Sequence, residues 1–200
     1  MPRLYFKFGA MGSSKTAQAL MCRYNYQQQG FRVLMMKPSV DCRDKDSNGK
    51  IIVRSRIGLS SPCVVFQKDD NLYEYIKNNS WLNSNDVVII DECQFCTKEQ
   101  IEQLKEATYF IPVLCYGLKT NFKTELFEGS KRLLEIADSI AEIKSVCKCG
   151  QKATINARFI NGEVTLDGDE VVIEGDVKYR GMCYNCFTEA IRNPLKKPKL

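Results

Sequence analysis

The stretch LYFKFGAMGSSKT, residues 4–16, decides the fold of this 200-residue chain. The aromatic-rich run 4–8 predicts a strand, and 15–29, with apolar side chains on neighbouring turns, predicts a helix. The segment between them has the composition and position of a phosphate-binding loop, where backbone N–H groups and a helix N-terminus surround an anion. A glycine turn that merely links strand to helix is the alternative.

Two side chains at the end of this loop have the chemistry that a bound nucleotide needs. The ammonium of Lys15 is expected to reach the β- and γ-phosphates, and the hydroxyl of Thr16 to bind Mg²⁺. Ser14 stands where glycine usually precedes the lysine, and a Cβ there calls for a negative φ. The residues predicted to bind phosphate are Gly9, Ala10, Met11, Gly12, Ser13, Ser14, Lys15 and Thr16.

The remainder of residues 1–144 alternates strand and helix patterns. Further strands are predicted at 31–36, 86–90, 111–115 and 140–144, with helices at 69–79, 98–107 and 129–137 and a polar loop at 39–50. This βαβ alternation predicts an α/β fold of the P-loop NTPase type, with a parallel sheet and helices on both faces.

Two acids follow the apolar run 87–90 directly. The carboxyl ends of parallel strands face the ligand crevice in open α/β sheets, so Asp91 and Glu92 are expected beside the phosphate loop. Asp91 is expected to hold Mg²⁺. Glu92 is the candidate general base, because an alcohol needs a carboxylate to accept its proton during phosphoryl transfer. An exposed turn is the alternative.

The overall composition excludes several classes of protein. Histidine is absent, which rules out Ser-His-Asp and Cys-His catalysis, and the net charge of +5 is mild for this length. No segment approaches the roughly 20 apolar residues of a membrane span, and the N-terminus does not resemble an export signal. We therefore expect a cytoplasmic protein with no membrane partner and a disordered basic tail at 193–200.

Four of the ten cysteines form two close pairs: Cys147 with Cys149, and Cys183 with Cys186. Four thiolates suffice for a closed, structural zinc site, and buried unligated cysteines are the alternative. The pairs bracket 152–180, whose alternating polar residues and glycines predict hairpins. We expect a separate zinc-binding domain at 145–192. The other six cysteines are expected to have packing roles.

Several motifs together resemble the zinc-containing thymidine kinases. They are GAMGSSKT (9–16), DECQF (91–95), YGLKTNFKTELFEGS (116–130), and IEGDVKY (173–179) followed by CYNC (183–186). The resemblance implies a kinase that uses ATP, Mg²⁺ and structural Zn²⁺ to phosphorylate the 5′-hydroxyl of thymidine. It also implies a zinc-held lasso loop over the nucleoside, a homotetramer, and feedback inhibition by dTTP. Residues 33–36 and the helices could supply a subunit interface.

The resemblance also assigns roles to side chains whose chemistry alone does not reveal them. Asp41 and Arg43 match a pair near the phosphates and metal. The residues matching those around thymidine are Met11, Phe95, Leu118, Phe122, Phe127, Val172, Ile173 and Tyr179. Three departures from the family pattern stand out: Ser14, the shortened first cysteine pair, and Glu174 in place of a glycine.

Two other classes of function share parts of this pattern. A nucleic-acid-dependent ATPase would use Glu92 to activate water and the zinc module to grip a polynucleotide. The acids that lie between the cysteine pairs argue against such a grip on phosphates, and we expect no nucleic-acid partner. A non-catalytic nucleotide sensor would not need Glu92.

Overall fold

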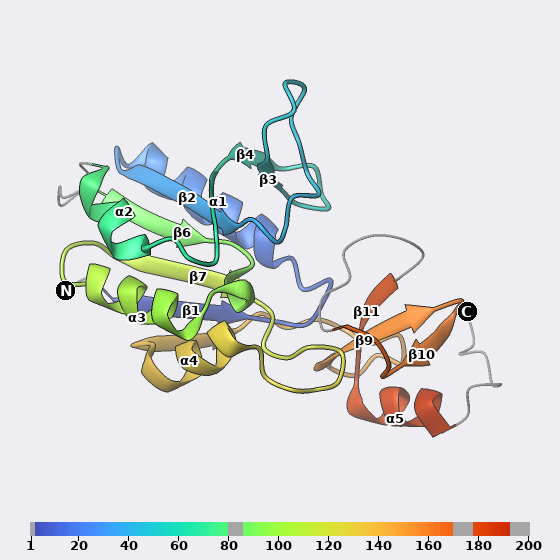
Figure 1. Cartoon of the computed structure of the whole chain (residues 1–200). Coiled ribbons are helices and arrows are strands. Elements are labelled where there is room, and N and C mark those ends of the chain that lie inside the picture. The colour runs from blue at the N-terminus through green and yellow to red at the C-terminus, as the bar shows by residue number, and fades with distance from the viewer. Residues whose placement is uncertain (1–2, 80–85, 170–177, 193–200) are drawn as a thin grey trace.

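The computed structural model describes residues 3–79, 86–169 and 178–192. Its centre is a six-stranded sheet in the order β5-β2-β6-β7-β1-β8, whose neighbouring strands all run parallel (Figure 1). The strands are β1 (Leu4–Phe8), β2 (Arg32–Pro38), β5 (Val64–Phe66), β6 (Asp86–Ile90), β7 (Val113–Gly117) and β8 (Ser139–Glu142). The predicted parallel α/β fold is confirmed.

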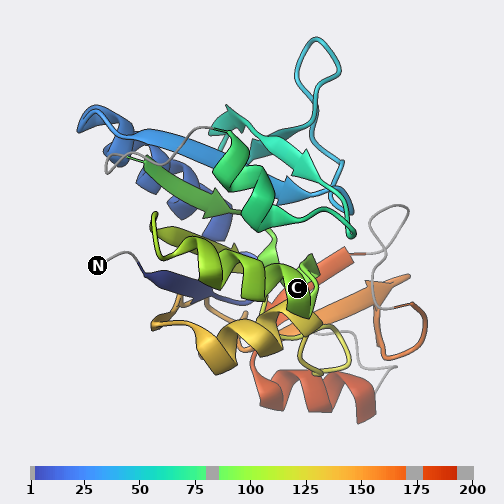
Figure 2. The same ribbon diagram turned by 60° about the vertical axis from the view of Figure 1, so that its left-hand side comes forward.

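Helices cover both faces of this sheet, as Figures 1 and 2 show. They are α1 (Lys15–Gln28), α2 (Leu72–Asn78), α3 (Lys98–Ala107) and α4 (Glu128–Ile136). Alternate residues of β6 point to opposite faces: Val88 and Ile90 pack with α2, α3 and α4, whereas Val87 and Ile89 pack with α1. A strand buried on both faces reads as a continuous apolar run, and this explains the sequence of β6.

The helix boundaries follow from capping. Thr97 and Gln100 form a capping box, so α3 begins at the predicted Lys98. The side chain of Asn71 accepts a hydrogen bond from the N–H of Glu74, so α2 begins three residues later than predicted.

The prediction missed the short strands between β2 and α2. β3 (Ile52–Arg54) and β4 (Ser60–Pro62) form an antiparallel pair beside the main sheet, and β5 lies on its edge. The strand β2 also extends to Pro38 and is buried in the core, with Met36 fully enclosed. The suggestion that 33–36 could supply a subunit interface is therefore wrong, because Leu34, Met35 and Met36 pack inside the chain.

The cysteine-bracketed segment forms a second, antiparallel sheet beside the carboxyl ends of the main strands (Figure 1). It contains β9 (Ile155–Ile160), β10 (Glu163–Thr165) and β11 (Lys178–Met182), followed by α5 (Tyr184–Arg192). The turn from β9 to β10 has positive φ at Asn161 and Gly162, the geometry of a tight hairpin, so the predicted hairpin is confirmed.

The helix α5 was not predicted, although the spacing of Phe187, Ala190 and Ile191 matches one helical face. These side chains pack on a small core that also contains Ile155, Phe159, Met182 and Ala10 of the phosphate loop. The predicted basic tail at 193–200 lies outside the described residues. No helix in the described part of the chain has the length and apolar character needed to cross a bilayer.

The start of α4 packs so closely against the segment after Glu92 that a methyl group does not fit. A Cβ on Gly129 would lie 2.6 Å from the carbonyl oxygen of Cys93 and 2.7 Å from that of Cys96. Both obstacles are backbone atoms, which cannot rotate away. The contact fixes the distance between α4 and the acidic motif.

We expect Gly129→Ala to lower the free energy of unfolding by about 1–3 kcal/mol, because overpacking against backbone outweighs the better helix propensity of alanine. Urea unfolding followed by circular dichroism measures the change. Lys131→Ala on the exposed side of the same helix is the control and should alter stability by less than about 0.5 kcal/mol. Equal midpoints for both variants would contradict this close contact.

Candidate active site and metal centre

The phosphate loop leaves the carboxyl end of β1 and is held by its neighbours. The N–H of Gly9 donates to the carbonyl oxygen of Gly117 at the end of β7, over 3.3 Å. A Cβ on Gly9 would lie 2.4 Å from the carbonyl oxygen of Ile143, so the close approach requires glycine. The N–H of Ser13 donates back to the carbonyl oxygen of Ala10 and closes the loop.

Ser14 adopts a left-handed conformation, with φ at 61°. The expectation of a negative φ at this position is therefore wrong: the loop keeps the backbone geometry that glycine usually supplies and accepts the strain of a Cβ. The Ser14 side chain makes no capping hydrogen bond to α1. The first N–H groups of α1 thus point into the loop without a side-chain cap, which suits an anion.

Lys15 lies across this loop in a buried position. Its Nζ donates to the carbonyl oxygen of Ala10 at 3.1 Å and to Oγ of Ser13 at 3.4 Å. Burial lowers the pKa of Lys15, whereas the charges of Glu92 and Asp91 act to raise it. The sheet therefore brings the loop lysine and both acids together, as the sequence predicted.

Asp91 continues the pairing of β6, with its N–H donating to the carbonyl oxygen of Met36 at 3.0 Å. Burial, and then the charge of Glu92, raise the pKa of Asp91 to about 7, although a hydrogen bond with the Thr16 side chain acts to lower it. A hydroxyl and a carboxylate in contact are the oxygen ligands that Mg²⁺ prefers. Thr16 and Asp91 therefore fit the predicted magnesium site.

Glu92 occupies a second left-handed position, with φ at 53°, directly after the strand. Its carboxylate oxygen Oε2 accepts a hydrogen bond from Nε2 of Gln94 at 2.6 Å, and Oε1 lies 3.7 Å from Nη2 of Arg43. The side chain is 18% exposed, so it is held in place and remains open to a substrate. Strained backbone at such a residue is typical of functional sites.

Gln94 is buried and links Glu92 to the segment after β7. While Nε2 donates to Glu92, Oε1 accepts from the N–H of Leu118 at 3.0 Å. A Cβ on Gly117 would lie 2.6 Å from that oxygen, so a side chain at this position would displace the Gln94 amide. Sequence reasoning placed Gln94 in the acidic motif but gave it no role.

Asp41 and Arg43 lie beside the acids, as the family resemblance implies. Asp41 accepts a hydrogen bond from Nε of Arg43 at 2.6 Å and pairs with the buried Lys37 at 3.0 Å. Burial tends to raise the pKa of Asp41, but the contacts with Arg43 and Lys37 outweigh it and hold the pKa below its usual value. Arg43 thus bridges Asp41 and Glu92.

The side chains matched to thymidine contacts fall into two groups near these acids. Phe95 and Phe127 meet edge to face, with ring centroids 5.7 Å apart. Leu118, Phe122 and Phe127 are buried, whereas Phe95 is half-buried and adds apolar surface beside Glu92. The segment 118–127, which carries three of these side chains, is closed by an antiparallel β-bridge between Thr120 and Leu126.

Tyr179 and Phe122 meet through a buried arginine. The guanidinium carbon of Arg158 lies 3.5 Å from the ring centroid of Phe122, and its Nε donates to the Tyr179 hydroxyl at 3.0 Å. Arg158 also donates to the carbonyl oxygens of Asp167 and Asp169. Val172 and Ile173 lie outside the described residues, as does the departure at Glu174.

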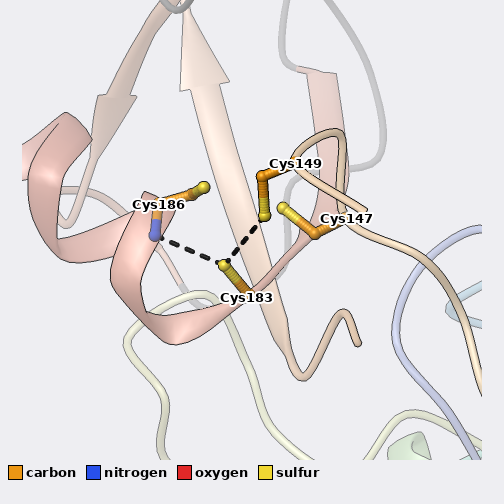
Figure 3. Close-up of side chains that lie close together, drawn as sticks. All are labelled: Cys147, Cys149, Cys183 and Cys186. Carbon is orange, nitrogen blue, oxygen red and sulfur yellow. Dashed lines mark hydrogen bonds between the residues drawn. The ribbon is translucent and has the colours of Figure 1, made fainter. Parts of the chain in front are cut away.

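The four predicted zinc ligands form one cluster, with sulfur atoms all within 4.8 Å of one another (Figure 3). Zinc–sulfur bonds of about 2.3 Å place tetrahedral ligands about 3.8 Å apart, and Sγ of Cys149 lies 3.6 Å from Sγ of Cys183. Burial raises the pKa of Cys147, but N–H groups of Cys149 and Cys183 outweigh it and give a pKa of about 7. Cys186 completes a set that could hold zinc.

Three residues that sequence reasoning did not single out connect these parts: Lys37, Asn156 and Arg158, each buried. On β9, Asn156 and Arg158 alternate with apolar residues and share one face of the strand. That face points inward, towards the phosphate loop and Phe122. The remaining cysteines are mixed: Cys93, Cys96 and Cys115 are buried as expected, whereas Cys42 is exposed.

A parallel α/β sheet with a glycine loop after β1, and with acids after β6 on the far side of β7, is the arrangement of the phosphate-loop class of proteins. The thymidine kinase family profile matches residues 2–187. A Photorhabdus laumondii protein named thymidine kinase is 43% identical over 202 residues, which cover 100% of this chain and 98% of the relative. The chain belongs to the thymidine kinase family.

Other relatives agree. A Shewanella oneidensis thymidine kinase is 43% identical over 197 residues, covering 96% of this chain and 99% of its own. A thymidine kinase from Escherichia coli O157:H7 is 39% identical over 195 residues, which cover 96% of this chain and 93% of the relative.

We expect Asp91→Asn to stabilise the metal-free protein, and more at about pH 8 than at about pH 5. A carboxyl whose pKa rises from 3.8 to about 7 on folding binds more protons when folded, so the wild type loses stability as the pH climbs between those values. Thermal unfolding in a chelator measures this. Asp69→Asn, at an exposed position, is the control, and an equal effect at both pH values would contradict the raised pKa.

We expect the metal-free protein to bind a single Co²⁺ ion per chain, with the thiolate charge-transfer and visible bands of a tetrahedral sulfur site. Cys183→Ser removes one ligand and should weaken binding by at least about tenfold. Cys42→Ser, an exposed cysteine outside the cluster, should bind cobalt as the wild type does. Spectra unaffected by Cys183→Ser would rule out the cluster.

Proposed function

We propose that this protein is an ATP:thymidine 5′-phosphotransferase that produces dTMP and ADP and uses Glu92 as general base. Membership in the thymidine kinase family supports the reaction. The observation that supports the residue roles is the convergence of Lys15, Asp91 and Glu92 at one sheet edge, beside the aromatic side chains of 95–127.

In the proposed reaction, the 5′-oxygen of thymidine bonds to the γ-phosphorus as the bond from that phosphorus to the β–γ bridging oxygen breaks. Glu92 accepts the hydroxyl proton, and ADP leaves. Lys15 and the open N–H groups at the start of α1 offset negative charge on the phosphates. Gln94 and Arg43 hold the Glu92 carboxylate in place. Positioning and charge supply most of the rate enhancement.

Two metals belong to this proposal. Thr16 and Asp91 would hold Mg²⁺, which when bound adds positive charge beside the phosphates. Cys147, Cys149, Cys183 and Cys186 would hold structural Zn²⁺, which leaves no open coordination position for chemistry. Asp41 and Arg43 would lie near the phosphates. Arg43 would link Asp41 to Glu92, because it contacts both carboxylates.

The remaining features follow the family pattern. Residues 1–144 would form the nucleotide-binding domain, and 145–192 the zinc-binding domain that covers thymidine. The proposed enzyme acts in the cytoplasm as a homotetramer and is inhibited by dTTP. Met11, Phe95, Leu118, Phe122, Phe127 and Tyr179 are proposed to surround the nucleoside.

The reaction is tested by mixing purified protein with ATP, Mg²⁺ and a panel of nucleosides, with single-stranded DNA and RNA in parallel. We expect phosphate transfer to thymidine and ATP turnover that polynucleotides do not stimulate. Hydrolysis that required a polynucleotide and produced no dTMP would favour the nucleic-acid-dependent ATPase instead.

We expect Glu92→Gln to lower kcat by at least about a hundredfold, because an amide cannot accept the hydroxyl proton. Affinities for thymidine and ATP should change less than about threefold, since size and shape are kept. Steady-state kinetics and calorimetry separate the two effects. Glu106→Gln on the exposed side of α3 is the control. A variant with wild-type kcat would remove Glu92 from its proposed role.

A further inference from the structure

The elements β9, β10, β11 and α5 form the cysteine-bracketed module. A buried asparagine of this module joins the two parts of the proposed active site. Asn156 on β9 is 3% exposed. Its Oδ1 accepts a hydrogen bond from the N–H of Met11 in the phosphate loop at 2.7 Å. Its Nδ2 donates to the carbonyl oxygen of Thr120 at 2.7 Å. A single side chain thus connects three segments that lie far apart in the sequence.

The orientation of this amide is fixed by its partners. The Met11 contact requires an acceptor and the Thr120 contact requires a donor, so only one of the two amide orientations satisfies both. Displacing either the phosphate loop or the 118–127 segment would leave a buried polar atom without its partner, which is unfavourable. The two segments are therefore held at a set separation.

Close backbone packing supports this connection. A Cβ on Gly181 of β11 would lie 2.7 Å from the carbonyl oxygen of Met11 and 3.2 Å from Cβ of Ala153. Ala10, the preceding loop residue, is buried within the core of the cysteine-bracketed module. The module therefore contacts both the phosphate loop, which is proposed to hold the nucleotide, and the segment 118–127, which is proposed to contact the nucleoside.

We propose that Asn156 is a positioning residue that couples the nucleotide site to the nucleoside site, so that each ligand strengthens binding of the other. Ordering of 118–127 around a nucleoside fixes the Thr120 carbonyl, and through Asn156 this fixes Met11. The reverse holds for a triphosphate in the loop, because coupling between two sites is reciprocal. The inference rests on the proposed function for the identity of the two ligands.

The test measures the affinity of the metal-loaded full chain for β,γ-imido-ATP with Mg²⁺ by calorimetry, with and without saturating thymidine. We expect thymidine to tighten wild-type binding by about fivefold or more, within the usual range of coupling. Asn156→Leu, similar in shape but lacking both hydrogen bonds, should reduce this ratio to about 1.

Asn156→Ala removes both contacts without adding a charge. Its methyl group neither accepts from the Met11 N–H nor donates to the Thr120 carbonyl oxygen. We expect affinity for β,γ-imido-ATP alone to stay within about threefold of the wild type while the coupling ratio falls to about 1. Ile160→Thr, at the exposed end of β9, is the control and should keep the wild-type ratio. Zinc content and thermal unfolding identify any variant that fails to fold.

Two results would overturn the inference while leaving the proposed function intact. One is a wild type that phosphorylates thymidine but shows no coupling. The other is a folded Asn156→Ala variant with the wild-type ratio. If the wild type neither binds nor phosphorylates thymidine, the proposed function itself fails and the inference falls with it.

Discussion

The charged groups at the carboxyl edge of the central sheet depend on one another. Lys15 and Asp91 are both removed from water, and burial alone disfavours charge on each. Glu92 acts to keep Lys15 protonated, while the same acid raises the pKa of Asp91. Such a cluster is stable only when every member keeps its partner, and much of the surrounding structure holds these partners in place.

The parallel sheet explains how this cluster is assembled. β1 and β6 both border β7 and end at the same edge, so the phosphate loop after β1 meets the acids after β6. Two backbone positions there, Ser14 and Glu92, are left-handed despite having side chains. Close glycine contacts at Gly117 and Gly129 keep the neighbouring segments against the residues that directly follow Glu92.

The cysteine-bracketed module is too small to be a robust fold by itself, and its core borrows Ala10 from the phosphate loop. Arg158 and Asn156 point from its sheet towards Phe122 and Met11. The four-cysteine cluster, the aromatic residue Phe122 and the phosphate loop are therefore parts of one packed unit. This packing makes the thiol cluster relevant to both proposed substrate sites.

The sequence by itself determined the features that depend on local spacing: the phosphate loop, the alternation of strands and helices, the acids after β6, and the four-cysteine set. It could not determine which polar residues are buried by distant partners. The alternation around Asn156 and Arg158 predicts a hairpin but not that both side chains are buried, and Met36 looks available for a subunit contact although it is enclosed in the core. Tertiary structure decided both points, because burial depends on which segments pack together, and hydrogen-bond partners that lie far apart in the chain leave no local pattern.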